Sequence, residues 1–130
     1  MTNKRVETDR APAAIGPYCQ AVMVGPWIYC SGQIALGPQG GELVGGGDVE
    51  AETRQVLDNL AAVLEQAGAS RADVVKATVY LADIDEFSKV NQIYAAFFDG
   101  LVPPARATVE VAGLPKGARV EIDFVAHVEG

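Results

Sequence analysis

The sequence predicts an α+β domain in which about six strands form one mixed sheet and two helices cover one face of it. Two kinds of pattern predict these elements. Runs of alternating or β-forming apolar residues are typical of strands, and apolar residues at three- and four-residue spacing are typical of helices. In chain order we expect strands at residues 19–24 and 27–31, a short edge strand at 42–44, a helix at 48–67, a strand at 73–81, a helix at 85–98, and strands at 106–111 and 120–128.

In the first half of the chain, Gly and Pro residues indicate where the predicted strands and the first helix begin and end. Gly25 and Pro26 separate the first two strands and favour a hairpin. Gly32 either marks a bulge or lets the backbone approach another group closely. Asp48 is placed to cap the first helix and Gly68 to end it. In the strand that follows, we expect one face to carry Val75, Ala77, Val79 and Leu81.

The second predicted helix has a polar residue on its apolar side. Asn91 lies four residues after Phe87 and three before Tyr94, so these three side chains share a face. A buried amide needs hydrogen-bond partners, or it costs stability. Either the local backbone satisfies Asn91, or Asn91 faces a ligand or a neighbouring chain.

The last two predicted strands each alternate polar and apolar residues, and a turn-like Leu-Pro-Lys-Gly loop joins them. If they pair directly, their polar faces coincide. One antiparallel register would then form ion pairs between Arg106 and Asp123 and between Glu110 and Arg119. The alternative is that Arg106 binds a substrate carboxylate, because a guanidinium offers a bidentate fork that Lys cannot match.

Length and composition bound the function. The 130 residues are expected to form one domain, residues 1–130. A net charge of −7 and a pI of about 4.5 argue against a nucleic-acid surface, which needs a basic stripe. No apolar run could span a bilayer and no secretory signal is present, so we expect no membrane partner and a cytoplasmic location. Cys19 and Cys30 are expected to be free, and one His without paired Cys predicts no metal site.

The number of helices also predicts assembly. Two helices are too few to cover both faces of a sheet of about six strands. The other face would leave apolar residues in contact with water. We therefore expect an oligomer in which sheets face one another.

Several segments together resemble the signature of the RidA-type (YjgF-like) enamine/imine deaminases, and the likeness covers nearly the whole chain. They are AIGPYCQA at residues 14–21, YCSGQI at 29–34, DIDEF at 83–87 with Val90, Asn91 and Tyr94, PARATVEV at 104–111, LPKG at 114–117 and VEI at 120–122. The resemblance implies a chorismate-mutase-like α+β fold and a homotrimer with ligand sites between subunits. It implies hydrolysis of 2-imino acids and their enamine tautomers, such as 2-iminobutanoate and 2-iminopropanoate, to 2-oxo acids and ammonia, without a cofactor.

The resemblance also assigns roles to single residues. Arg106 matches the carboxylate-binding arginine, and Glu121 matches the acid that orients or activates the attacking water. Tyr18, Ser31 and Asn91 match polar residues that line the cleft. Tyr18 as a cap of the hairpin and Ser31 as a residue that satisfies its own backbone remain alternatives.

Three further residues are weighed beside that motif. Thr108 stands near the ligand where the family often has Cys, which leaves the size preference for substrate open. His127 lies outside the motif and is read as a structural residue. Cys30 is read as a small core residue, because no basic neighbour is evident to lower its pKa.

Two rival functions remain. One is a ribonuclease, an activity also attributed to the family, against which the acidic composition argues. The other is a non-catalytic module that binds small carboxylates, or a holdase-type chaperone. The presence of both Arg106 and Glu121 favours catalysis over binding alone. The natural imine or enamine substrate is not determined by the sequence.

Overall fold

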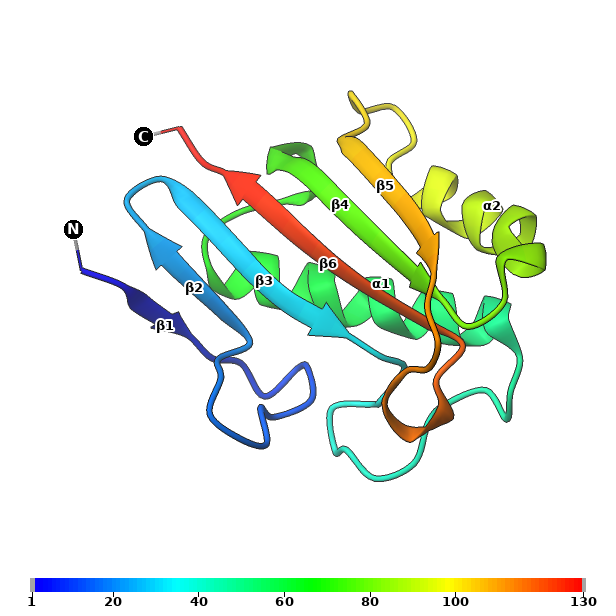
Figure 1. Ribbon diagram of the computed structural model, residues 1–130. Helices are drawn as coiled ribbons and strands as arrows, with labels where there is room; N and C mark the ends of the chain where they lie inside the picture. Colours follow the sequence, from blue (N-terminus) through cyan, green and yellow to red (C-terminus); the bar gives the residue numbers. More distant parts are fainter. Residues whose placement is uncertain (1, 130) are drawn as a thin grey trace.

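The computed structural model describes residues 2–129, which form a six-stranded sheet with two α-helices (Figure 1). The strands are β1 (Lys4–Val6), β2 (Ala21–Val24), β3 (Trp27–Gln33), β4 (Val74–Leu81), β5 (Ala105–Glu110) and β6 (Val120–His127); the helices are α1 (Val49–Gln66) and α2 (Phe87–Phe97). The predicted α+β class and number of strands are confirmed. The edge strand expected at residues 42–44 is wrong, since Leu43 makes only an isolated bridge to Leu36. The sixth strand is β1, whose three residues, two of them charged, are too few to show an alternating apolar pattern.

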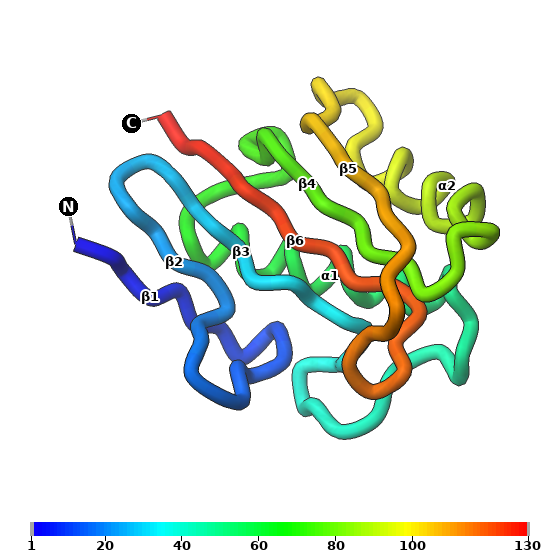
Figure 2. The backbone as a smooth tube through the Cα atoms, in the orientation of Figure 1, coloured from blue at the N-terminus to red at the C-terminus, as the bar shows by residue number. Residues whose placement is uncertain are grey.

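The order of strands in the sheet is β1-β2-β3-β6-β4-β5. All neighbours are antiparallel except β4 and β5, which are parallel and joined through α2. Figure 2 shows the chain leaving β5, looping round and returning as β6 on the other side of β4. The expected direct pairing of the last two strands is therefore wrong. Parallel strands need a crossover helix between them, and this crossover makes β5 an edge strand.

Both helices pack on one face of the sheet, as predicted. Helix α1 runs behind the sheet in Figure 1 and begins where the Asp48 side chain accepts a hydrogen bond from the backbone N–H of Glu50. The core between the helices and the sheet contains fully buried side chains from both layers, among them Ile28, Leu57, Leu60, Ile122 and Phe124. Helix α2 contributes Val90 and Tyr94 to the same core.

A bulge changes the expected facing of β4. The register with β6 shifts between Val74 and Lys76. Val74 is buried as a result, whereas Val75 is 43% exposed. The prediction that Val75 lies on the same face as Ala77 is wrong, because an extra residue in one strand turns the side chains before it to the other side.

The face of the sheet away from the helices remains open and partly apolar. Trp27 and Tyr29 on β3 are 40% and 51% exposed, whereas the alternating residues Ile28 and Cys30 are buried. Val109 on β5 is exposed on the same face. The uncovered apolar face expected from the sequence is present. Within residues 2–129, neither helix is long and apolar enough to cross a membrane.

Candidate active site

Arg106 and Glu121 lie on opposite faces of the sheet. Arg106 is paired in register with Ala77, which is fully buried under the helices, so its side chain leaves the sheet on the helix side. Glu121 is paired with Tyr80, the neighbour of buried Val79, and its side chain leaves on the open side. The expectation that the two polar faces coincide is wrong. Strand β4 separates β5 from β6, and the register of each with β4 decides separately which of its side chains face the helices.

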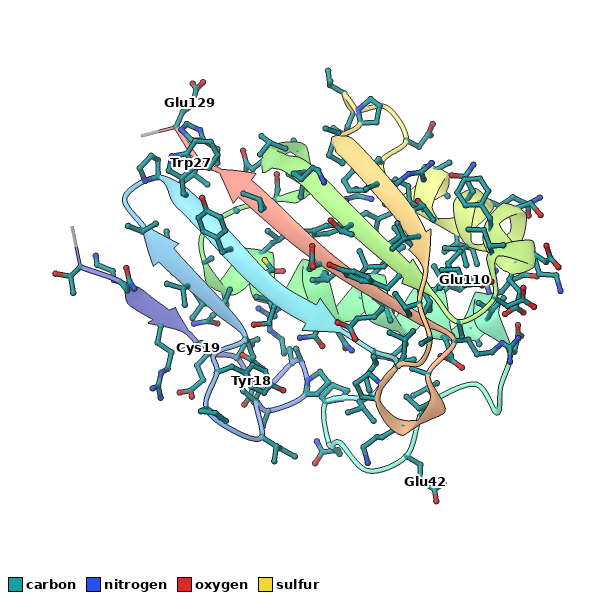
Figure 3. The ribbon with its side chains drawn as sticks, in the orientation of Figure 1. Tyr18, Cys19, Trp27, Glu42, Glu110 and Glu129 are labelled. Atoms are coloured by element: carbon teal, nitrogen blue, oxygen red, sulfur yellow. The ribbon has the colours of Figure 1, made fainter. Side chains whose placement is uncertain are left out.

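The predicted cross-strand ion pairs are also absent. Glu110 accepts a hydrogen bond from the backbone N–H of Ile84 at 2.9 Å, and Figure 3 shows it at the end of β5 close to α2. Arg119 instead pairs with Glu86, with Nε donating to Oε1 at 2.8 Å. Among the residues that the structure describes, no carboxylate forms an ion pair with Arg106.

Helix α2 supports the Arg106 guanidinium. Phe87, Asn91 and Tyr94 form one stripe on the helix, and together with Arg106 we call them the Arg106 cradle. The Nη1 of Arg106 donates to Oδ1 of Asn91 at 2.7 Å. Its Cζ lies 5.3 Å from the centre of the Phe87 ring and 4.8 Å from that of Tyr94, within the range of cation–π attraction. Two rings and an amide thus orient an exposed cation without neutralising it.

A pocket of about 380 Å³ opens beside the cradle, between the end of α2 and the start of β5. Its lining includes Asn91, Tyr94, Pro104 and Arg106. The hydroxyls of Tyr94 and Thr108 are buried without a hydrogen-bond partner in the described part of the chain. Burial raises the pKa of Tyr94, and the nearby Arg106 charge partly opposes this. Thr108 faces the helix side two residues after Arg106 but does not line the pocket.

Glu121 belongs to a second pocket of about 400 Å³, which we call the Glu121 pocket. Its polar and charged lining includes Tyr18, Lys116 and Glu121. Most of the remaining wall is apolar and comes from the loops before β2, after β3 and before β6; it consists of Pro12, Ala13, Ile15, Ile34, Leu36 and Pro115.

The backbone at Gly32 lies against the Glu121 carboxyl group. The β3–β6 register shifts between Cys30 and Gln33, so Gly32 sits in a bulge. A Cβ at Gly32 would overlap the carboxylate and lie 2.9 Å from its Cδ. Both sequence interpretations of this glycine hold, since it marks a bulge and also permits a close approach.

The Glu121 carboxyl group has no internal partner of opposite charge. In the described residues it forms neither an ion pair nor a side-chain hydrogen bond. Burial and the neighbouring Asp123 raise the pKa of Glu121. A carboxyl group with a raised pKa is suited to exchange protons near neutral pH.

The remaining predicted residues divide between the two regions. Tyr18 is 53% exposed on the loop before β2 and lines the Glu121 pocket (Figure 3). The Ser31 hydroxyl donates to the backbone oxygen of Cys19 at 2.5 Å, and Ser31 does not line that pocket. It therefore satisfies a backbone group of another segment and not, as the alternative expected, its own. The Asn91 amide oxygen accepts a hydrogen bond from Arg106, so its partner is that side chain and not the local backbone.

Sequence reasoning missed the part played by Phe87 and Tyr94. Both were read as core residues of α2, yet both rings contact the Arg106 guanidinium. The spacing of residues 87, 91 and 94 was the available signal, since it places them on one helix face. What it did not reveal was that β5 would lie against that face.

The geometry defines what one copy of the chain can do. It presents an oriented cation on one side of the sheet and a half-buried proton-exchanging carboxyl group on the other. One copy alone cannot bring both groups onto one small molecule. Two copies can, if the Arg106 cradle of one faces the Glu121 pocket of another.

Comparisons with known proteins agree with this picture of the fold. The family model described as Endoribonuclease L-PSP matches residues 8–128. The chain is 53% identical to the 2-iminobutanoate/2-iminopropanoate deaminase of Mus musculus over 126 residues, 97% of this chain and 92% of that protein. It is 50% identical to a RutC family protein of Synechocystis, covering 97% of each. The crystal structure of E. coli TdcF with bound serine matches with a TM-score of 0.92 at 41% identity, over 97% of this chain and 99% of that one.

Proposed function

Because this chain belongs to the endoribonuclease L-PSP family, the RidA-type (YjgF-like) proteins, we propose that it hydrolyses reactive 2-imino acids and their enamine tautomers. The products are a 2-oxo acid and ammonia. The substrates we propose are 2-iminobutanoate and 2-iminopropanoate, which the name of the mouse relative specifies for that protein.

The observation that carries this proposal is the unpaired Arg106. Its guanidinium is held by Asn91 and two aromatic rings, and no carboxylate of the described residues occupies its remaining donors. A planar guanidinium binds a carboxylate through two parallel hydrogen bonds. The group common to all 2-imino acids is such a carboxylate. Arg106 therefore supplies binding and orientation.

Glu121 supplies the proton transfers. The carbon of a protonated imine is already electrophilic, so a positioned water provides most of what the reaction needs. The water oxygen bonds to that carbon, the C=N π electrons move to nitrogen, and the Glu121 carboxylate takes a proton from the water. The Glu121 acid then returns the proton to the amine. The C–N bond breaks and ammonia leaves while the hydroxyl gives its remaining proton to the Glu121 carboxylate, so that the carbonyl forms. Glu121 finally releases that proton to solvent or to the departing ammonia.

The opposite facing of the two residues supports a site shared between copies of the chain. In our proposal the open sheet face, with exposed Trp27, Tyr29 and Val109, packs against neighbouring copies in a homotrimer. The Arg106 cradle of one copy then meets the Glu121 pocket of the next. Tyr18 on the rim of that pocket contacts the same substrate.

Mixing two inactive variants tests the whole proposal. Arg106→Lys and Glu121→Gln, carrying different tags, are expressed separately and together, and doubly tagged assemblies are purified. Threonine dehydratase generates 2-iminobutanoate, and the release of 2-oxobutanoate is timed. We expect either variant alone to be inactive. Whichever variant contributes two copies, one of the three shared sites in a mixed trimer contains both intact residues, so about one third of the activity should return.

Each outcome separates one claim from the others. An unmodified protein that does not accelerate 2-oxobutanoate release contradicts the deaminase function. An active protein whose mixed assemblies stay inactive contradicts the shared site. Cleavage of RNA by a nuclease-free preparation, lost in Arg106→Lys, would support the rival ribonuclease. Binding of small carboxylates without turnover would support the non-catalytic module.

A further inference from the structure

The open face of β6 carries two carboxyl groups next to each other. Glu121 and Asp123 are two residues apart on one strand, so their side chains lie on the same face. Both are partly buried. Asp123 is not part of the site described above, and it does not line the Glu121 pocket. Two carboxylates at this spacing repel each other when both are ionised.

Tyr80 distinguishes the two carboxyl groups. It lies opposite Glu121 in the β4–β6 register, and Thr78 lies opposite Asp123. The Tyr80 hydroxyl nevertheless reaches along the sheet and donates to Oδ2 of Asp123 at 3.0 Å. Glu121, the direct neighbour, receives no hydrogen bond from it. The Asp123 carboxylate therefore has a hydrogen-bond donor on this face that Glu121 lacks.

Other charged or titratable groups on this face are less directly placed. Lys76 on β4 and His127 on β6 lie farther along the sheet, since they align with Val125 and Trp27. On the neighbouring strands, β3 adds Tyr29 to this face, and β5 adds the uncharged Ala107 and Val109. Cys30, the next residue on β3, pairs with buried Phe124 and faces the helix side. Lys116 enters from the loop before β6.

The Asp123 charge also acts on two neighbouring groups. Burial first, and then the charge of Asp123, raise the pKa of the Cys30 thiol to about 12. Burial, the hydrogen bond to Asp123 and that same charge raise the pKa of Tyr80. Both shifts have the same direction as the one at Glu121.

We propose that Asp123, held by the hydrogen bond from the Tyr80 hydroxyl, is a positioning residue that makes Glu121 the proton-exchanging carboxyl group of the site. The pair works because its two members have different surroundings: Asp123 is hydrogen-bonded, and its negative charge favours the protonated form of Glu121. Without Asp123, Glu121 would give up its proton at lower pH. The inference rests on the proposed function of Glu121 but concerns its titration as well as its activity.

The first test measures titration directly and needs no activity. The side-chain carboxyl carbons of Glu121 and Asp123 are followed by ¹³C NMR between pH 3 and 9 in the unmodified protein, Asp123→Asn and Tyr80→Phe. In Asp123→Asn we expect Glu121 to titrate at lower pH, because the neighbouring negative charge is gone. In Tyr80→Phe we expect a smaller shift of Glu121 in the same direction, because the hydroxyl no longer holds the Asp123 carboxylate. Unchanged titration of Glu121 in Asp123→Asn overturns the proposal.

The second test uses the pH dependence of kcat/KM for 2-iminobutanoate. The limb at low pH, where the Glu121 base becomes protonated, should move to lower pH by a similar amount in Asp123→Asn. A uniform loss at every pH without movement of the limb would mean that Asp123 is only structural. Asp58→Asn is the control, because Asp58 is an exposed acid on α1 in the other layer. Asp58→Asn removes the same charge and should leave the low-pH limb of kcat/KM where it is.

The two tests also separate this inference from the proposed function. A shifted NMR titration with no deaminase activity in any of the proteins would leave the Asp123 effect standing and contradict the function. An active protein whose Glu121 titration ignores Asp123 would do the reverse. A neighbouring copy's Arg106, if it lies beside Glu121, lowers the pKa of Glu121 in every variant alike and cancels from the comparison.

Discussion

The Arg106 cradle and the Glu121 pocket position their charged groups by different means. Arg106 extends from edge strand β5 and is oriented by side chains of one helix, through a hydrogen bond to Asn91 and two aromatic rings. Glu121 extends from an interior strand, and what lies against it is backbone, at the bulge of Gly32. The cradle supports an exposed cation by contacts, whereas the pocket destabilises a carboxylate by burial and by a like charge.

This difference fits the division of work in the proposed site. A cation that binds an anion needs fixed geometry and free donors, and the cradle has both. A group that takes up and releases a proton needs a perturbed pKa, and Glu121 has a raised one. Neither region forms an ion pair among the described residues, which is why we propose that the cradle of one copy meets the pocket of another.

The largest expected effect comes from Arg106→Lys. Lysine keeps the charge but loses the bidentate fork and the hydrogen bond to Asn91. We expect kcat/KM to fall on the order of 100-fold or more, about 3 kcal/mol of transition-state stabilisation, while the circular dichroism spectrum stays unchanged.

Arg71→Lys is the matched control for that change. Arg71 also lies over a ring, 5.4 Å from the centre of Phe97, and its Nη1 donates to the backbone oxygen of Phe97 at 2.8 Å. Arg71 belongs neither to the cradle nor to the lining of the two pockets, so its replacement should leave kcat/KM within about twofold. Near-normal turnover by Arg106→Lys would contradict carboxylate binding by the cradle.

The next effect sharpens the comparison at the pocket. Gly32→Ala places a methyl group where the Glu121 carboxylate lies, and the carboxylate must move. We expect kcat/KM to fall by about tenfold or more, since small displacements of a catalytic group are costly. Gly113→Ala is the control, because a Cβ there meets no atom within 4 Å. Neither glycine has a positive φ, so backbone strain does not enter. Equal activity of the two variants would show that the position of Glu121 is unimportant.

A smaller effect is expected from Asn91→Ala in the cradle. The guanidinium keeps both rings but loses its 2.7 Å hydrogen bond to the amide. A hydrogen bond of this kind contributes about 1 kcal/mol, so KM should rise by roughly fivefold with a smaller change in kcat. Gln92→Ala, on the exposed side of the same helix, should change neither constant. A loss confined to kcat would mean that Asn91 contacts the reacting atoms and does more than support Arg106.

The smallest effect compares one tyrosine from each region. Tyr94→Phe removes a buried hydroxyl that has no partner among the described residues, so the free energy of unfolding should rise by up to about 1 kcal/mol. Tyr80→Phe removes a hydroxyl that donates to Asp123, so the free energy of unfolding should fall by up to about 1 kcal/mol. Urea unfolding of the two variants measures the difference. A less stable Tyr94→Phe together with a more stable Tyr80→Phe would contradict the partners assigned to both hydroxyls.

Local pattern determined most of the elements. Apolar spacing predicted α1 and α2, and the caps at Asp48 and Gly68 set the ends of α1 to within a residue. The family motif also identified the candidate site residues, among them Tyr18, Arg106 and Glu121. Their joint action, the single domain and the cytoplasmic location stay predictions.

The sequence by itself determined which residues carry charge and which faces of each strand and helix are apolar, because these properties depend on neighbours a few positions away. Only the tertiary structure decided that β4 lies between β5 and β6, that the bulges turn Val75 outward and bring Gly32 against Glu121, and that Arg106 and Glu121 point to opposite sides. Strand order and register arise from contacts between distant segments. A one-residue shift in register reverses every side chain of a strand, and no local pattern reports that shift.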